Sequence, residues 1–209
     1  MRGRFLTFEG GEGAGKTTLI EKIYAYLQSE GENVVRTRAP GGTAVGAEIR
    51  RLLLDTPHAS LSKRCELFLF LADRAQHVDE VIRPALERQQ IVLCDRFNDS
   101  TLAYQGQARG FERQWLERLL FFACDHVLPD LTFYLDCDPE IGFQRAAERR
   151  SGKDRIESED LAFHRAIRSA FLQIAEKERD RFIVIDATLS KEQVFEYARK
   201  KIDVLIHPR

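Results

Sequence analysis

The stretch Phe5-Leu-Thr-Phe-Glu-Gly-Gly-Glu-Gly-Ala-Gly-Lys-Thr-Thr18 decides the fold of this 209-residue chain. Phe5–Phe8 is apolar and predicts a buried strand, and Leu19–Leu27 is apolar at helical spacing. Between them, Gly10–Thr17 matches every fixed position of the P-loop pattern. A strand, a glycine-rich loop and a helix in this order are the context that the pattern requires. The sequence therefore predicts a nucleoside triphosphate site rather than a glycine-rich turn beside an ordinary surface lysine.

The loop Gly10–Thr17 is chemically suited to phosphate. Its glycines let successive backbone N–H groups turn inward and bind anions, and the next helix adds free N–H groups and the positive end of its dipole. Lys16 supplies a mobile cation for the β- and γ-phosphates, and the Thr17 hydroxyl is an expected Mg²⁺ ligand. The residues expected around the triphosphate are Gly10, Gly11, Glu12, Gly13, Ala14, Gly15, Lys16, Thr17 and Thr18.

Composition narrows the class of protein. Hydrophobic residues make up 44% of the chain and charged residues 31%, as in a globular protein. The net charge of −1 argues against a general nucleic-acid or membrane-surface binder. No apolar run approaches the ~20 residues of a membrane span, and the four cysteines form no C-x-x-C pair typical of zinc sites. Since the first strand leaves no room for a signal peptide, we expect a cytoplasmic protein.

Strand-like and helix-like segments alternate along the rest of the chain. Further strands are predicted at 33–38, 91–94, 131–136 and 182–186, and helices at 44–54, 61–88 (with a break at Pro84), 111–124, 139–145, 159–179 and 191–205. Residues 95–101 are predicted to form a polar loop. Such alternation implies a parallel sheet covered by helices on both faces. The sequence thus predicts one doubly wound α/β domain over residues 1–209.

Two strand ends carry residues that suit a second, anionic substrate. Asp95 follows the third strand and can hold Mg²⁺, usually through water. Arg96 follows at once and places guanidinium donors beside the phosphates, which suits an anionic acceptor better than a water nucleophile. Arg38 ends the second strand on the same edge of the sheet. Two converging arginines would form an acceptor phosphate site; the alternative for Asp95 and Arg96 is a surface ion pair.

Two other groups of residues have both a functional and an ordinary interpretation. Phe70 and Arg74 share a helix face, so the ring could stack on a base while the guanidinium donates to a base carbonyl. Phe70 could equally belong to the core. The basic run Arg149, Arg150, Lys153 and Arg155 is either a solvated surface or a lid, at about 149–157, that neutralises the moving phosphoryl group. The five histidines form no recognisable pattern and receive no role.

Several motifs, taken together, resemble thymidylate kinases of the bacterial type. The P-loop is shared with many kinases, but the combination is far more specific, and it runs in order from Phe5 to about Thr188. The matching segments are Phe8–Thr18, Thr37-Arg-Ala-Pro-Gly-Gly-Thr43, Leu71-Ala-Asp-Arg74, Asp95-Arg-Phe97, Ala103-Tyr-Gln-Gly106, Pro129–Asp136 and Asp154-Arg-Ile-Glu157.

The resemblance implies a P-loop nucleoside monophosphate kinase-like fold with a five-stranded parallel sheet and a short basic lid. It also implies phosphoryl transfer from ATP·Mg²⁺ to dTMP, giving dTDP and ADP, in a homodimer. The acceptor residues that it implies are Glu12 for the 3′-hydroxyl, Arg38 and Arg96 for the 5′-phosphate, Phe70 for stacking, Arg74 for thymine O4, Ser100, Thr101 and Gln105 for thymine and sugar, and Tyr104 at the 2′ position. On the donor side it implies that Arg145 packs on adenine, with Ala187 beside that base.

The expected mechanism needs no general base, because the acceptor phosphate is already an anionic nucleophile. The protein then positions the substrates and stabilises charge. The metal ligands expected are Thr17 and Asp95, and the catalytic set expected is Lys16, Asp95, Arg96, Arg149, Arg150, Lys153 and Arg155.

One position departs from the family pattern. The family usually has Arg-Glu-Pro-Gly-Gly where this chain has Arg38-Ala-Pro-Gly-Gly42, so a carboxylate close to the metal and Arg38 is missing. We expect activity to persist because Asp95 and Glu12 remain. Two alternatives stay open: a kinase for dUMP or dCMP, and a non-catalytic ATP-binding regulator. Arg74 can only donate hydrogen bonds, which favours thymine or uracil over cytosine.

Overall fold

The computed structural model describes residues 3–54, 61–148 and 154–207. Its centre is a five-stranded sheet in the order β2-β3-β1-β4-β5, with every neighbouring pair parallel. The strands are β1 (Arg4–Gly10), β2 (Val34–Arg38), β3 (Ile91–Asp95), β4 (Leu131–Asp136) and β5 (Phe182–Asp186). The predicted five-stranded parallel sheet is confirmed, and each strand lies close to its predicted bounds.

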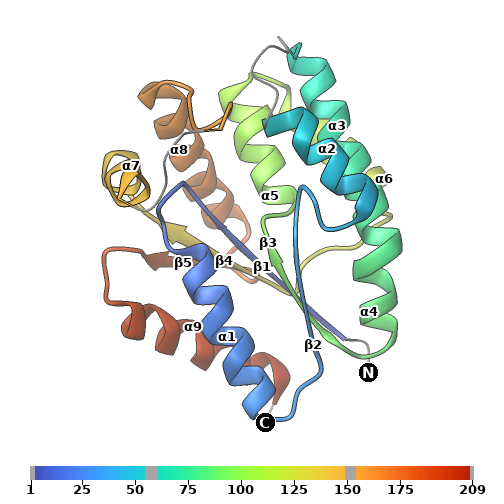
Figure 1. Ribbon diagram of the computed structural model, residues 1–209, viewed down its shortest axis with the longest axis vertical. Helices are drawn as coiled ribbons and strands as arrows, with labels where there is room; N and C mark the ends of the chain where they lie inside the picture. Colours follow the sequence, from blue (N-terminus) through green and yellow to red (C-terminus); the bar gives the residue numbers. More distant parts are fainter. Residues whose placement is uncertain (1–2, 55–60, 149–153, 208–209) are drawn as a thin grey trace.

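Helices cover both faces of this sheet (Figure 1). One face is covered by α1 (Lys16–Ser29) and α9 (Lys191–Ile206), and the other by α4 (Arg83–Glu87), α8 (Leu161–Lys177) and the π-helical segments η1 (Val78–Ile82) and η2 (Leu102–Ala108). The remaining helices are α2 (Ala44–Leu54), α3 (Lys63–His77), α5 (Asn98–Thr101), α6 (Arg113–Ala123) and α7 (Pro139–Ala147). None of the helices in the described part of the chain has the length and apolar character needed to cross a membrane.

The central strand β1 supplies side chains to both layers. Leu6 and Phe8 belong to the hydrophobic cluster beneath α1 and α9, whereas Phe5 belongs to the cluster that contains Val78 and Ile82 on the opposite face. All three β1 side chains are fully buried. Because successive side chains of a strand point to opposite faces, a strand covered on both sides must be apolar almost throughout. This is why the run before the P-loop predicts the centre of the sheet.

The segment predicted as a polar loop after β3 is helical from Asn98 onward, and this prediction was wrong. Here α5 runs directly into η2. The reason is that the four side chains of α5 are buried, and those of Asn98, Asp99 and Ser100 are hydrogen-bonded within the protein. Asp99 is 1% exposed, and its carboxylate accepts from Arg181 at 2.8 and 2.9 Å and from Thr132 at 3.2 Å. An aspartate satisfied in this way can occupy a buried helix that polarity alone would assign to solvent.

The predicted helix over 61–88 is confirmed in outline as α3, η1 and α4 in succession. Ser62 caps its start, with Oγ accepting from the backbone N–H of Cys65 at 3.2 Å. Pro84 lies in the first turn of α4, where the N–H that proline lacks is not needed. The predicted break in the helix is therefore not at Pro84 itself but at the π-helical turn η1 that precedes it.

The P-loop and α7 approach each other at two glycines. A Cβ on Gly13, which has φ +67°, would overlap the carbonyl group of Gly142. Conversely, a Cβ on Gly142 would overlap the carbonyl oxygen of Glu12. Because glycine has no Cβ, the backbone of α7 can contact the backbone of the P-loop directly.

We expect Gly142→Ala to destabilise the protein, although alanine normally favours a helix interior by about 1 kcal/mol over glycine. The added methyl group would overpack the contact with Glu12 at a cost of about 1–3 kcal/mol, which we expect to exceed the gain in helix propensity, and each net kcal/mol would lower the Tm in thermal unfolding by about 2–4 °C. Gly11→Ala is the matched control, because a Cβ there meets nothing within 4 Å. An unchanged Tm for Gly142→Ala would contradict the close approach.

Candidate active site

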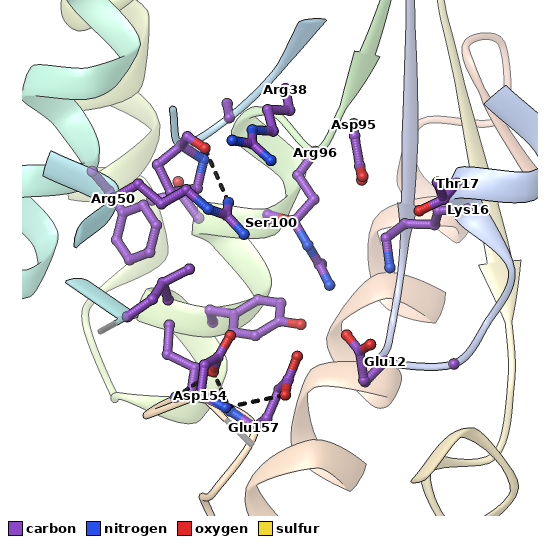
Figure 2. A pocket seen from close by; sticks show the side chains of 18 of the residues that line it. Glu12, Lys16, Thr17, Arg38, Arg50, Asp95, Arg96, Ser100, Asp154 and Glu157 are labelled. Carbon is purple, nitrogen blue, oxygen red and sulfur yellow. Dashed lines mark hydrogen bonds between the residues drawn. The ribbon is translucent and has the colours of Figure 1, made fainter. Parts of the chain in front are cut away.

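A cavity of about 400 Å³ opens where β1, β2 and β3 end. These strands are neighbours in the sheet, so the segments that follow them meet at one edge. Figure 2 shows Lys16 and Thr17 on one side of this cavity and Arg38, Arg50 and Arg96 on the other. The predicted residues that line it are Glu12, Gly13, Gly15, Lys16, Thr17, Thr18, Arg38, Phe70, Arg74, Asp95, Arg96, Ser100, Thr101, Tyr104 and Gln105.

Lys16 lies at the P-loop end of the cavity and is 8% exposed. Its ammonium group donates to the carbonyl oxygens of Gly10 at 3.1 Å and Gly11 at 2.8 Å. Burial, and next the charge of Arg96, lower the pKa of Lys16 to about 8. A desolvated cation that faces another cation is stabilised when an anion arrives, so this end of the cavity suits phosphate.

Asp95 and Thr17 provide oxygen atoms beside the P-loop. The Oδ1 atom of Asp95 is buried and has no hydrogen-bond partner among the described residues. Carboxylate and hydroxyl oxygens are ligands that Mg²⁺ prefers. In the described part of the chain no three or more His, Cys, Asp or Glu side chains gather as a metal-binding group.

Three arginines from three different elements meet opposite the P-loop (Figure 2). Arg38 ends β2, Arg50 belongs to α2 and Arg96 follows β3. Arg50 donates to the carbonyl oxygen of Pro40 at 3.0 Å, and burial, followed by the charge of Arg38, lowers the pKa of Arg50. Arg96 has a left-handed backbone with φ 66°, and its N–H donates to the carbonyl oxygen of Phe8 at 3.0 Å. The cluster of like charges would be relieved by a phosphate group.

Phe70 and Arg74 share a face of α3, and both line the cavity. Phe70 also belongs to a hydrophobic cluster with Ile49 and Leu53. The side chain is therefore partly a core residue, which was the alternative interpretation of the sequence. Arg74 is 1% exposed and donates to the carbonyl oxygen of Phe97 at 3.0 Å. Its Nε and Nη1 atoms have no hydrogen-bond partner among the described residues. Because unmet buried donors are costly, a ligand carbonyl at this point would be stabilising.

Another wall of the cavity comes from η2 and from α5, which sequence analysis had assigned to a loop. The Oγ1 atom of Thr101 is buried without a hydrogen-bond partner in the described part of the chain. The guanidinium carbon of Arg96 lies 5.4 Å from the centre of the Tyr104 ring, within cation–π range. This wall supplies the predicted acceptor residues Ser100, Thr101, Tyr104 and Gln105.

The two residues predicted beside adenine lie outside this cavity and contact each other. The Nη1 atom of Arg145, on α7, donates to the carbonyl oxygen of Ala187 at 2.8 Å. Ala187 directly follows β5. The hydrogen bond thus joins α7 to the turn after the edge strand.

The predicted lid is only partly described. Arg155 is described, and it does not line the cavity. Its guanidinium group donates to Glu66 Oε2 at 2.6 Å and to the carbonyl oxygen of Leu53 at 2.8 Å, so in this arrangement Arg155 anchors its segment to α2 and α3. The cavity is lined instead by the neighbouring residues Asp154, Ile156 and Glu157. The other predicted lid residues, Arg149, Arg150 and Lys153, lie outside the described residues.

Glu9 is a residue of the site that sequence reasoning missed. It is fully buried at the end of β1, where its Oε1 accepts from the N–H of Phe97 at 2.7 Å and its Oε2 from the hydroxyl of Ser100 at 2.5 Å. Burial, followed by the charge of Asp99, raises the pKa of Glu9 to about 7, although Arg96 and the hydrogen bonds oppose this shift. The available signal was an acidic residue inside an otherwise apolar strand.

Arg50 and His164 also line the cavity without having been assigned a role. For Arg50 the signal was its position four residues after Gly46, on the buried face of α2. Neither Arg38 nor Arg50 has an ion-pair partner among the described residues, and Arg50 donates only to the carbonyl oxygen of Pro40. Both guanidinium groups therefore remain available to a ligand.

Comparison with known proteins places these features in one family. The family model described as thymidylate kinase matches residues 8–197. The chain is 49% identical to the thymidylate kinase of Desulfovibrio desulfuricans, over 98% of this chain and 97% of that protein. It is 45% identical to the thymidylate kinase of Protochlamydia amoebophila, over 95% and 91% of the two chains. A crystal structure of thymidylate kinase from Ehrlichia chaffeensis aligns with a TM-score of 0.78 at 34% identity, covering 97% of this chain and 99% of that one.

The buried carboxyl of Glu9 predicts a specific pH dependence of stability. Its pKa is about 7 in the folded protein against 4.5 for an ordinary glutamate, so between these values the folded state binds the proton more tightly. The resulting stabilisation is complete below pH 4.5 and is lost as the pH rises through 7. The shift corresponds to about 3 kcal/mol.

We therefore expect Glu9→Gln to gain about 3 kcal/mol in free energy of unfolding, relative to the wild type, between pH 4.5 and pH 7. Glutamine keeps an acceptor for Phe97, and its amide group can donate to the Ser100 hydroxyl. Urea unfolding of both proteins across this range measures the difference, in which titrating groups that do not interact with Glu9 cancel. A difference that does not change with pH would refute the assignment.

Proposed function

This chain belongs to the thymidylate kinase family and phosphorylates dTMP with ATP as the phosphoryl donor, and we propose that its cavity binds the two substrates end to end. The observation that carries this proposal is the cluster of Arg38, Arg50 and Arg96 across the cavity from Lys16. The P-loop side suits a triphosphate, and the arginine side suits a separate monophosphate. An enzyme that only hydrolysed ATP would have no use for the second cationic site.

At the donor end, the P-loop residues Gly10–Thr18 bind the phosphates of ATP. Lys16 exchanges the carbonyl oxygens of Gly10 and Gly11, to which it now donates, for phosphate oxygens. The exchange is favourable because the carbonyl groups are neutral and the phosphate is anionic. Arg145, fixed to Ala187 at the carboxyl end of the sheet, borders the adenine.

Mg²⁺ is the expected companion of ATP, and the side chains beside the P-loop fit it. Thr17 would supply a hydroxyl ligand, and the Oδ1 atom of Asp95, which has no hydrogen-bond partner among the described residues, would hold the ion through water. When bound, the ion neutralises charge on the phosphates. The described carboxylates are too few for a cage made of protein ligands alone.

At the acceptor end, the 5′-phosphate of dTMP binds Arg38, Arg50 and Arg96, and thymine stacks on Phe70. Arg74, which lines the cavity with two donors that have no hydrogen-bond partner among the described residues, donates to O4 of the base. Around the sugar, Glu12 accepts from the 3′-hydroxyl and Tyr104 crowds the 2′ position, which disfavours ribonucleotides. Ser100, Thr101 and Gln105 complete this wall.

The reaction itself requires orientation and charge stabilisation. An oxygen of the acceptor phosphate attacks the γ-phosphorus in line with the departing ADP, and no proton has to be removed first. Lys16 and Arg96 flank the transferred group and stabilise the charge that shifts toward ADP. The predicted lid residues Arg149, Arg150 and Lys153 would add further cations. Arg155 instead anchors the lid segment to α3 through its ion pair with Glu66.

We further propose that the protein is a homodimer assembled through α3 and α6. These neighbouring helices expose large hydrophobic side chains, with Phe68 57% exposed, Trp115 40%, Phe121 50% and Phe122 86%. A second copy of the chain would cover this apolar surface.

A cytoplasmic location is supported by the four free cysteines, since a reducing compartment keeps thiols unpaired.

The test of this function is ADP release in a coupled assay with ATP·Mg²⁺ and a panel of dTMP, dUMP, dCMP, dGMP, UMP and thymidine. We expect release to be fastest with dTMP and slow without an acceptor. Release that is independent of any acceptor would indicate a different P-loop ATPase. ATP binding without release for any acceptor would favour a regulatory protein.

In the same assay we expect Lys16→Ala to reduce kcat with dTMP by roughly 10²- to 10³-fold, because the variant loses a preorganised charge at the transferred phosphoryl group. Lys22→Ala is the control on the same helix, since Lys22 pairs with Glu192 at the surface. Near-normal turnover of Lys16→Ala would rule out the role given to this lysine.

We expect Phe122→Glu to shift the protein from dimer to monomer in size-exclusion chromatography with light scattering. A charge placed at the centre of an apolar interface remains desolvated and unpaired. Val204→Glu, at a residue of α9 that is 71% exposed, is the matched control and should leave the dimer intact. A wild-type monomer, or a Phe122→Glu dimer, would contradict the proposed interface.

A further inference from the structure

Glu66 is a buried carboxylate that joins three segments around the acceptor end of the cavity. It lies one helical turn before Phe70 on α3 and is 1% exposed. It accepts from Gln105 Nε2 at 2.9 Å, from Arg109 Nε and Nη2 at 3.1 and 3.2 Å, and from Arg155 Nη2 at 2.6 Å. Both of its oxygen atoms are therefore occupied by donors that come from other elements.

The two arginines hold this carboxylate in place and in its ionised form. Arg109 also pairs with Glu159 at 2.6 Å, and Arg155 also donates to the carbonyl oxygen of Leu53 at 2.8 Å. Burial alone would raise the pKa of Glu66, but the hydrogen bonds from Arg109, Gln105 and Arg155 outweigh it and lower the pKa. An ionised carboxylate can only accept hydrogen bonds.

This constraint fixes the orientation of the Gln105 side chain. Because Glu66 can only accept, the amide NH₂ group of Gln105 must face it, and the amide carbonyl oxygen is the atom left for the cavity. Gln105 is 2% exposed and, like Arg74, lines the cavity. The amide cannot rotate by half a turn without placing its carbonyl oxygen against the carboxylate.

The cavity consequently offers a donor from Arg74 and an acceptor from Gln105. Thymine and uracil present the complementary pattern, with the C4 carbonyl beside the N3–H group. Cytosine presents the reverse, an amino group beside an unprotonated N3. A buried hydrogen-bonding site discriminates strongly against a ligand that leaves its groups unpaired.

We propose that Glu66 is a positioning residue for base selection, which fixes the Gln105 amide so that the acceptor site accepts a thymine-type base and rejects a cytosine-type base. This inference rests on the proposed binding of a nucleoside monophosphate beside Phe70 and Arg74. Glu66 itself need not touch the substrate. Its effect passes entirely through Gln105.

The test is Glu66→Gln, whose amide can donate as well as accept and so permits Gln105 to rotate. We expect the ratio of kcat/KM for dTMP to that for dCMP to fall by roughly tenfold, the factor that one ordinary net hydrogen bond supplies. The ratio for dTMP to dUMP should not change, because these bases share the same N3 and C4 edge. If Glu66 were merely structural, both dTMP and dCMP turnover would fall by one factor and the dTMP to dCMP ratio would stay constant, which would overturn the proposal.

A second variant, Gln105→Met, keeps the charges of Glu66, Arg109 and Arg155 and removes the amide. It should lose the same selectivity, and the double variant should lose no more than Gln105→Met alone, since the two residues act in series. Additive losses, or an unchanged ratio in Gln105→Met, would refute the proposal even if Glu66→Gln fails to fold.

Asp130→Asn is the control for general destabilisation. Asp130 is a 10% exposed carboxylate that accepts from the N–H of Phe5 at 2.8 Å, at the opposite end of the sheet. We expect this variant to keep the wild-type ratio of dTMP to dCMP, and a fall comparable to that of Glu66→Gln would overturn the inference. Wild-type protein without dTMP turnover would contradict the proposed function itself, which distinguishes the two failures.

Discussion

The buried carboxylate of Glu9 joins the two halves of the active site. It stands at the end of the central strand, immediately before the P-loop, and holds the N–H of Phe97 and the hydroxyl of Ser100. The donor side of the cavity consists of the P-loop after β1 and the first turn of α1, whereas α5 and η2 form the acceptor wall. This carboxylate therefore sets the distance between the phosphate loop and the acceptor wall, and the desolvation that raises its pKa is the cost of that connection.

The charges of the cavity are arranged for substrates that are themselves anions. Lys16, Arg38, Arg50 and Arg96 lie around one space, and the lowered pKa values of Lys16 and Arg50 reflect burial and mutual repulsion. The negative charge of a bound phosphate group would offset both the desolvation of these cations and their mutual repulsion. Substrate binding is therefore electrostatically favourable. In the described part of the chain, neither Arg38 nor Arg50 has an ion-pair partner that would compete with a phosphate group.

Much of the fold and part of the site could be predicted from local signals. The strands were recognisable because each is a short apolar run that the sheet buries on both faces, and Phe70 with Arg74 because four-residue spacing fixes a common helix face. By contrast, α5 was mistaken for a loop, since Asp99 is compensated by Arg181, a partner 82 residues away. Arg155 was predicted to be a lid residue that faces the phosphates. Its partner Glu66 lies 89 residues away in the sequence, so no local pattern indicates this ion pair.

The sequence by itself determined the P-loop, the parallel sheet and the chemical types at the strand ends, because these follow from contiguous patterns with fixed spacing. It could not determine which polar groups are satisfied internally. Only the tertiary structure decided that Glu9 faces inward to Phe97 and Ser100, that Arg50 joins the phosphate arginines and that Glu66 orients Gln105. The physical reason is that the state of a buried polar group depends on partners brought together by folding from distant parts of the chain.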